Sequence, residues 1–115
     1  MSALERGLAL WRAGELWEAH EAWEASWREL DRSDPRARAL RGLIQAAAAG
    51  LKAREGRASG VASLCAKATG ELRAAGEVVE LEGRSLLAAH MADELEAWCA
   101  AGAEGPPPEP NLADD

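Results

Sequence analysis

Ten consecutive residues without a charge, 42–51, constrain most strongly what this chain can fold into. At about 100° per residue they form a helix with one bulky apolar face and an opposite face of small residues. The bulky face carries Leu40, Leu43, Ile44, Ala47 and Leu51, and the small face carries Gly42, Ala46, Ala49 and Ala53. Because both faces require neighbours, this segment is predicted to be the central helix. Gln45 is the only polar side chain in the run, so we expect it to be partly buried and to need hydrogen-bond partners.

The rest of the chain has the composition of a helical protein, because Ala, Leu, Glu and Arg dominate and β-branched residues are few. The central helix is expected to begin at Pro35, with Asp34 as its cap, and to end near Gly56. Four other helices are expected over residues 2–14, over 15–30, along an apolar stripe from Val61 to Leu72, and over 85–101. Residues 76–83 are expected to be a connection, and no strand is predicted. The fold class is therefore all-α, a compact single-domain bundle of about five helices with short loops.

A length of 115 residues gives room for one domain with a core of its own. We assign residues 1–101 to the helical bundle. Residues 102–115, with the sequence GAEGPPPEPNLADD, are rich in proline and acidic side chains. They are predicted to form a disordered, flexible tail.

The charge pattern excludes several classes of partner. The formal net charge is −7, and six acids within residues 15–31 precede seven bases within 32–57. This pattern is typical of two neighbouring helices with complementary solvated faces. A nucleic-acid interface is not expected, because the tryptophans lie on the acidic segment rather than among the bases. No membrane partner is expected either, since no apolar run spans a bilayer and no secretory signal is evident. Cys65 and Cys99 lack ligand spacing, so they are interpreted as packing thiols of a cytoplasmic protein.

The segment 15–30 carries the residues that could perform chemistry. His20 falls within the apolar stripe of this helix, and Glu24 lies four residues further on the same side. A carboxylate and an imidazole at this spacing can share a proton or bind a divalent metal such as zinc. The candidate catalytic residues are His20, Glu21 and Glu24, and the candidate metal ligands are His20 and Glu24. The competing interpretation is a core histidine that pairs with a nearby acid and serves packing alone.

A second pair, His90 and Glu94, repeats the His-x-x-x-Glu spacing in the last predicted helix. If the two helices faced each other, the two pairs would form a cage for a divalent metal with two imidazoles and two carboxylates. No nucleophile motif and no glycine-rich phosphate loop is present.

Two motifs together are similar to a known family. Trp17-Glu18-Ala19-His20-Glu21, followed by Trp23 and Trp27, precedes Arg41-Gly42-Leu43-Ile44-Gln45-Ala46-Ala47-Ala48. Over roughly residues 3–75 the chain resembles the small bacterial and archaeal domain-of-unknown-function family 309. The resemblance implies a small helical bundle, and some members carry a predicted label of metal-dependent hydrolase. Its shared polar residues would here be Glu18, His20, Glu21 and Gln45, and its shared aromatic residue would be Trp27.

Two functions from different classes follow. In the first, the chain is an enzyme or metal site built on His20, Glu21 and Glu24, with Gln45 orienting. In the second, it is a non-catalytic binding or self-association module in which the same cluster fixes helix packing. Exposed tryptophans then contact a partner, and a second copy of the chain is one candidate. The candidate ligand-binding residues are Trp17, Glu18, Trp27 and Gln45. The substrate and the cofactor, if any, are not specified by the sequence.

Overall fold

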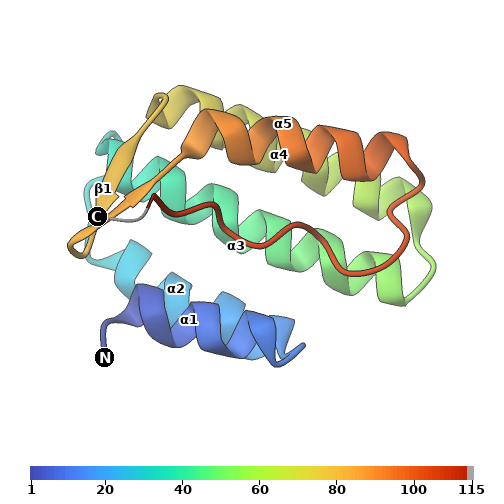
Figure 1. The fold of residues 1–115 in the computed structure, drawn as a ribbon, viewed down its shortest axis with the longest axis horizontal. Coiled ribbons are helices and arrows are strands. Elements are labelled where there is room, and N and C mark those ends of the chain that lie inside the picture. The colour runs from blue at the N-terminus through green and yellow to red at the C-terminus, as the bar shows by residue number, and fades with distance from the viewer. Residues whose placement is uncertain (114–115) are drawn as a thin grey trace.

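The computed structural model describes residues 1–113. It confirms the all-α bundle of five helices and shows one small hairpin in addition. The elements in chain order are α1 (Ala3–Arg12), α2 (Leu16–Arg28), α3 (Pro35–Arg54), α4 (Ala58–Ala75), β1 (Val79–Leu81), β2 (Arg84–Leu86) and α5 (Ala88–Ala100). In Figure 1, α1 and α2 lie on one side of α3, while α4 and α5 lie on the other. No helix of the described part is long and apolar enough to cross a membrane.

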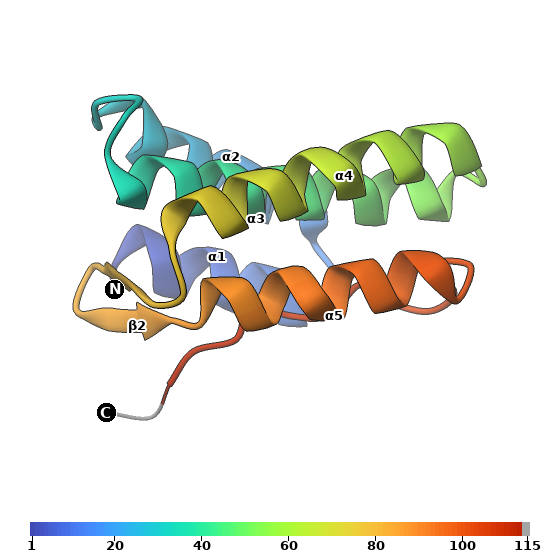
Figure 2. The ribbon, with the colours of Figure 1, turned by 90° about the horizontal axis from the view of Figure 1, so that it is seen from above.

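Helix α3 is central, as its uncharged run predicts. It packs against α2 and α4, and Figure 2 shows α3 and α4 running side by side. The small face allows the close approach, because a Cβ on Gly42 would lie only 2.7 Å from the Leu72 Cγ of α4. On the bulky face Leu43 is fully buried.

Polar side chains cap the first turns of α1 and α3, and the Asp34 cap of α3 was predicted from the sequence. The Ser2 hydroxyl accepts a hydrogen bond from the Glu5 amide at 3.1 Å and begins α1. The Asp34 carboxylate accepts from the Arg36 amide at 2.9 Å, with Pro35 in the first turn of α3. Each satisfies one amide that has no partner within its own helix.

Residues 79–86 differ from the prediction of a chain without strands. They form an antiparallel hairpin, and the strand register pairs Val79 with Leu86. Glu82 and Gly83 both have positive φ, 48° and 84°, as the favoured two-residue hairpin turn requires. Burial of Leu81 and the two paired residues anchors the hairpin on the core, and α5 consequently begins at Ala88.

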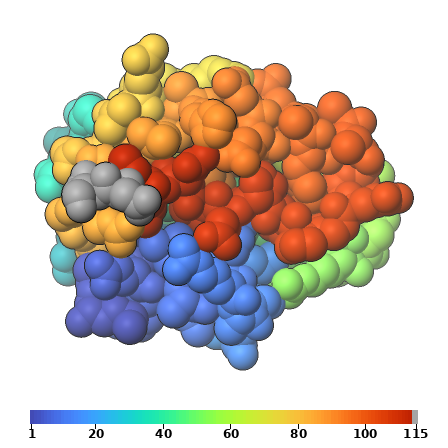
Figure 3. Space-filling view, viewed as in Figure 1, coloured from blue at the N-terminus to red at the C-terminus, as the bar shows by residue number. Residues whose placement is uncertain are grey.

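Residues 102–113, expected to be a flexible tail, instead lie against the helices, and residues 114–115 fall outside the described part. Figure 3 shows this segment, in red, between α1 in blue and α5 in orange. Pro107 is buried beside Gly50 of α3, whose missing side chain leaves space for the ring. The Asn111 carbonyl accepts a hydrogen bond from the Leu87 amide at 2.8 Å, and Leu112 forms a β-bridge with Leu86. The exposed edge of β2 and the small residues of α3 therefore hold the segment in place.

Candidate functional site

His20 and Glu24 are neighbours on α2, as their spacing predicts. The His20 Nε2 lies 3.2 Å from the Glu24 Oε2, and the two side chains are 20% and 26% exposed. The other oxygen of this carboxylate, Oε1, accepts a hydrogen bond from the Arg28 guanidinium. Both oxygens of Glu24 are therefore engaged within α2 itself.

An indole covers one face of the His20 ring. The rings of Trp17 and His20 are stacked, with centroids 5.1 Å apart and planes 18° apart. Trp17 itself is 53% exposed, so it lies between the imidazole and solvent. The stack and the Glu24 contact together fix the orientation of the imidazole.

Two buried polar atoms have no hydrogen-bond partner among the described residues. They are the His20 Nδ1 and the Gln45 Oε1, on the packed helices α2 and α3. Gln45 is half-buried, as predicted for the one polar side chain of the central run. Its carbonyl oxygen is not satisfied by any protein group described here.

The other candidate residues of α2 are placed differently. Glu18 and Glu21 are both exposed to solvent. Trp23 is fully buried toward α1, where its indole N–H donates to the Leu4 carbonyl at 3.3 Å. The structure thus places the two exposed carboxylates apart from the buried part of the cluster.

The predicted two-histidine cage is not formed. His90 lies 3.6 Å from Glu94 on α5, and its side chain is 61% exposed. Helix α5 packs against α4, whereas α2 packs against α1 and α3. Residues 1–113 contain no group of three or more His, Cys, Asp or Glu side chains that could hold a metal ion. Glu94 is used differently, since it accepts a hydrogen bond from the Asn111 amide at 2.8 Å.

The thiols pack in the core between α4 and α5. Cys65 is buried, Cys99 is half-buried, and both are free. Burial first, and the neighbouring Cys99 second, raise the pKa of the Cys65 thiol to about 12. A group that stays protonated to this extent is a poor nucleophile.

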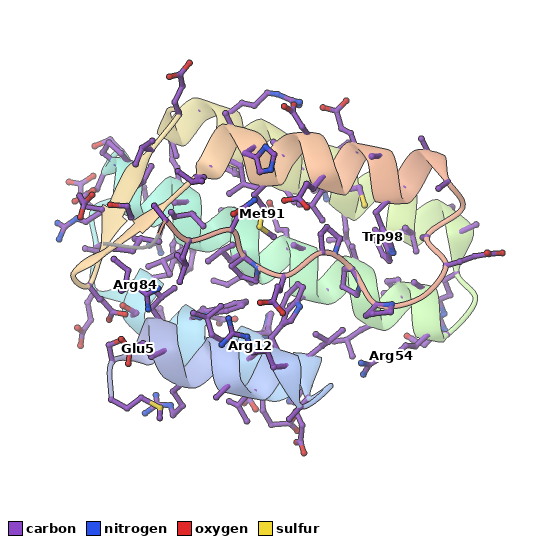
Figure 4. All side chains as sticks on the ribbon, viewed as in Figure 1. Glu5, Arg12, Arg54, Arg84, Met91 and Trp98 are labelled. Atoms are coloured by element: carbon purple, nitrogen blue, oxygen red, sulfur yellow. The ribbon has the colours of Figure 1, made fainter. Side chains whose placement is uncertain are left out.

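A hollow of about 620 Å³ lies between α1, β2 and the segment 108–112. Figure 4 labels three of its charged residues, Glu5, Arg12 and Arg84. The charges are paired within the protein: Arg12 lies 3.0 Å from Glu109, and Arg84 lies 4.0 Å from Glu5. Sequence reasoning missed this hollow, because it exists only when the C-terminal segment folds back.

Arginine side chains surround Trp27 near the loop between α2 and α3. The guanidinium carbon of Arg32 lies 3.7 Å from the centroid of the Trp27 ring, and that of Arg41 lies 5.1 Å away. In the sequence these arginines were interpreted as part of a solvated basic face. The signal that could have found the cluster is the capped turn at residues 31–35, which brings the start of α3 back beside the end of α2.

Comparison with known proteins shows the family to which the chain belongs. No curated protein and no solved structure gives a significant match to the chain. Residues 4–64, from α1 into α4, match the family model described as "Domain of unknown function (DUF309)". They include α2 and α3, which carry the polar cluster. The chain therefore belongs to the domain-of-unknown-function family DUF309.

Proposed function

We propose that this chain is a non-catalytic binding module in which the His20–Glu24 pair stabilises the surface of α2. The observation that carries the proposal is the confinement of the imidazole. Its Nε2 contacts Glu24, its ring face is stacked on Trp17, and its Nδ1 is enclosed. A general base needs a nitrogen within hydrogen-bond reach of a substrate. In His20, Nε2 is taken up by Glu24 and Nδ1 is buried, so neither nitrogen is available to a substrate.

Metal-dependent hydrolysis fits these residues poorly. A catalytic metal site uses about three protein ligands and keeps one position open. The cluster offers His20 and Glu24, and the carboxylate already binds Arg28. The described residues bring no third imidazole, thiolate or carboxylate to this pair.

The aromatic side chains of α2 support binding as the function. Trp17 is more than half exposed, and Trp27 is half-buried beneath two arginines. Tryptophan and arginine are enriched where proteins recognise partners. A second copy of the chain is one candidate partner. A dimer in sedimentation velocity that Trp17→Gln dissociates would support self-association, and a monomer at micromolar concentration would exclude it there.

The test compares two histidines with the same sequence spacing. His20→Ala removes a mostly buried imidazole that contacts Glu24 and stacks on Trp17, so we expect the free energy of unfolding to fall by about 2 kcal/mol or more. His90→Ala removes an exposed imidazole, and we expect a change within about 0.5 kcal/mol. Urea unfolding followed by circular dichroism measures both.

The opposite result would favour a functional site. Residues that serve catalysis or ligand binding are often replaced with no loss of stability, or with a gain. If His20→Ala is as stable as the wild type, the cluster is not a packing device and the proposal is wrong.

A further inference from the structure

We propose that Trp27, Arg32 and Arg41 form a binding site for an oxyanion, the phosphate or carboxylate group of a small molecule. This inference rests on the proposed binding function and names the chemistry of its ligand. The three residues come from the last turns of α2, from the loop after it and from α3. They border a cavity of about 350 Å³ together with Ala37, Arg38 and Glu71.

The geometry of the two arginines supports an anion site. Both guanidinium groups lie over the Trp27 ring, at 3.7 and 5.1 Å from its centroid. A guanidinium that stacks on an aromatic face is held in place while its N–H groups stay directed outward. Two such groups on one ring provide fixed donors for an anion without the entropic cost of ordering two mobile side chains.

The charge balance of the cavity also favours an anion. Arg38 lies 3.8 Å from Glu71, so this pair is neutral as a unit. Arg32 and Arg41 have no carboxylate within 4.0 Å among residues 1–113, although most other arginines of the chain do. The cavity lining thus holds three arginines and one carboxylate, a formal excess of positive charge in a chain whose net charge is −7.

Two acids, Asp31 and Asp34, lie in the turn beside these arginines. The Asp31 carboxylate accepts hydrogen bonds from the amide and the hydroxyl of Ser33 at 3.0 and 2.9 Å. The Asp34 carboxylate accepts from the Arg36 amide and guanidinium. Asp34 is thus paired with Arg36, whereas Asp31 accepts only from neutral groups and keeps its charge, which also acts on Arg32.

The guanidinium donors of Arg32 and Arg41 match the shape of an oxyanion. The planar fork of a guanidinium fits two oxygens of a carboxylate or phosphate at once, and such charge-assisted bonds are stronger than neutral ones. The cavity volume is at the lower end of the range for ligand sites, about 300 to 1,000 Å³. This leaves room for a small organic body beside the anion.

Isothermal titration calorimetry of the full chain with inorganic phosphate, and separately with citrate, tests the proposal. We expect at least one of them to bind with a dissociation constant near or below about 1 mM. Arg32→Gln and Arg41→Gln should each weaken binding about tenfold, the loss of one charge-assisted contact. The control is Arg6→Gln, which removes the same charge from an exposed arginine of α1 and should leave binding unchanged.

The titrations also identify the source of the oxyanion. Stronger binding of phosphate indicates a phosphate ester, and stronger binding of citrate indicates a carboxylate. Absence of heat with both anions up to about 10 mM overturns the proposal, as does equal weakening by Arg6→Gln. Its failure is distinguishable from that of the binding module. A destabilising His20→Ala with no anion bound rejects only this ligand. A neutral His20→Ala with anion bound overturns the proposed function as stated and leaves the anion site standing.

Discussion

The substitution Gly7→Ala has two opposing effects on the free energy of unfolding. It raises the helix propensity of α1, and it introduces a steric clash in the core. In the middle of a helix, alanine is favoured over glycine by about 0.5 to 1 kcal/mol. At Gly7, however, a Cβ would lie 2.7 Å from the Cδ1 of Trp23 and closer still to its Nε1. That indole is fully buried and donates to the Leu4 carbonyl, so it has no free space into which to move.

The expected net effect is a loss of about 2 kcal/mol. Overpacking a core costs about 1 to 3 kcal/mol, and a weakened buried hydrogen bond costs about 1 more. Subtracting the propensity gain leaves about 2 kcal/mol, or a melting temperature lower by about 8 °C at this chain length.

The matched control is Gly70→Ala on α4. Gly70 is exposed, and a Cβ there would meet nothing within 4 Å. Only the propensity gain applies, so this variant should be more stable than the wild type by about 0.5 to 1 kcal/mol. Urea unfolding of the three proteins by circular dichroism measures the difference. If Gly7→Ala gains as much stability as Gly70→Ala, the packing of Trp23 against α1 is not as described.

Two further predictions concern the C-terminal segment and the thiols. Truncation after Ala101 should lower the melting temperature, because it removes buried Pro107 and the backbone hydrogen bonds to Ser85 and Leu87 and exposes the surface beneath them. An unchanged midpoint by calorimetry would show that the segment contributes nothing. Iodoacetamide at pH 8 should modify Cys99 well before Cys65, because a raised pKa means that the Cys65 thiolate becomes abundant only as the pH approaches about 12. Equal rates in peptide mass spectrometry would contradict the burial of Cys65.

The features predicted from sequence are those that depend on local spacing. The central position of α3 follows from its uncharged run, and the contact of His20 with Glu24 follows from four residues of helical separation. The hairpin had a local signal that was not recognised, the turn at Glu82 and Gly83 between alternating segments.

The features missed depend on residues that are distant in the sequence. The position of the C-terminal segment requires Gly50 to accept Pro107, which no periodicity reveals. The cluster around Trp27 combines α2, a loop and α3, and so depends on the angle of the turn. The two-histidine cage failed for the same reason, because α2 and α5 pack against different neighbours.

The central claim is that the polar cluster of α2 serves packing and recognition rather than metal-dependent chemistry. The most direct test is the metal content of the untagged wild type and of folded His20→Ala, both measured by plasma mass spectrometry. We expect no metal in near-stoichiometric amount that depends on His20. Near-stoichiometric zinc, manganese or iron that disappears in the variant would contradict it.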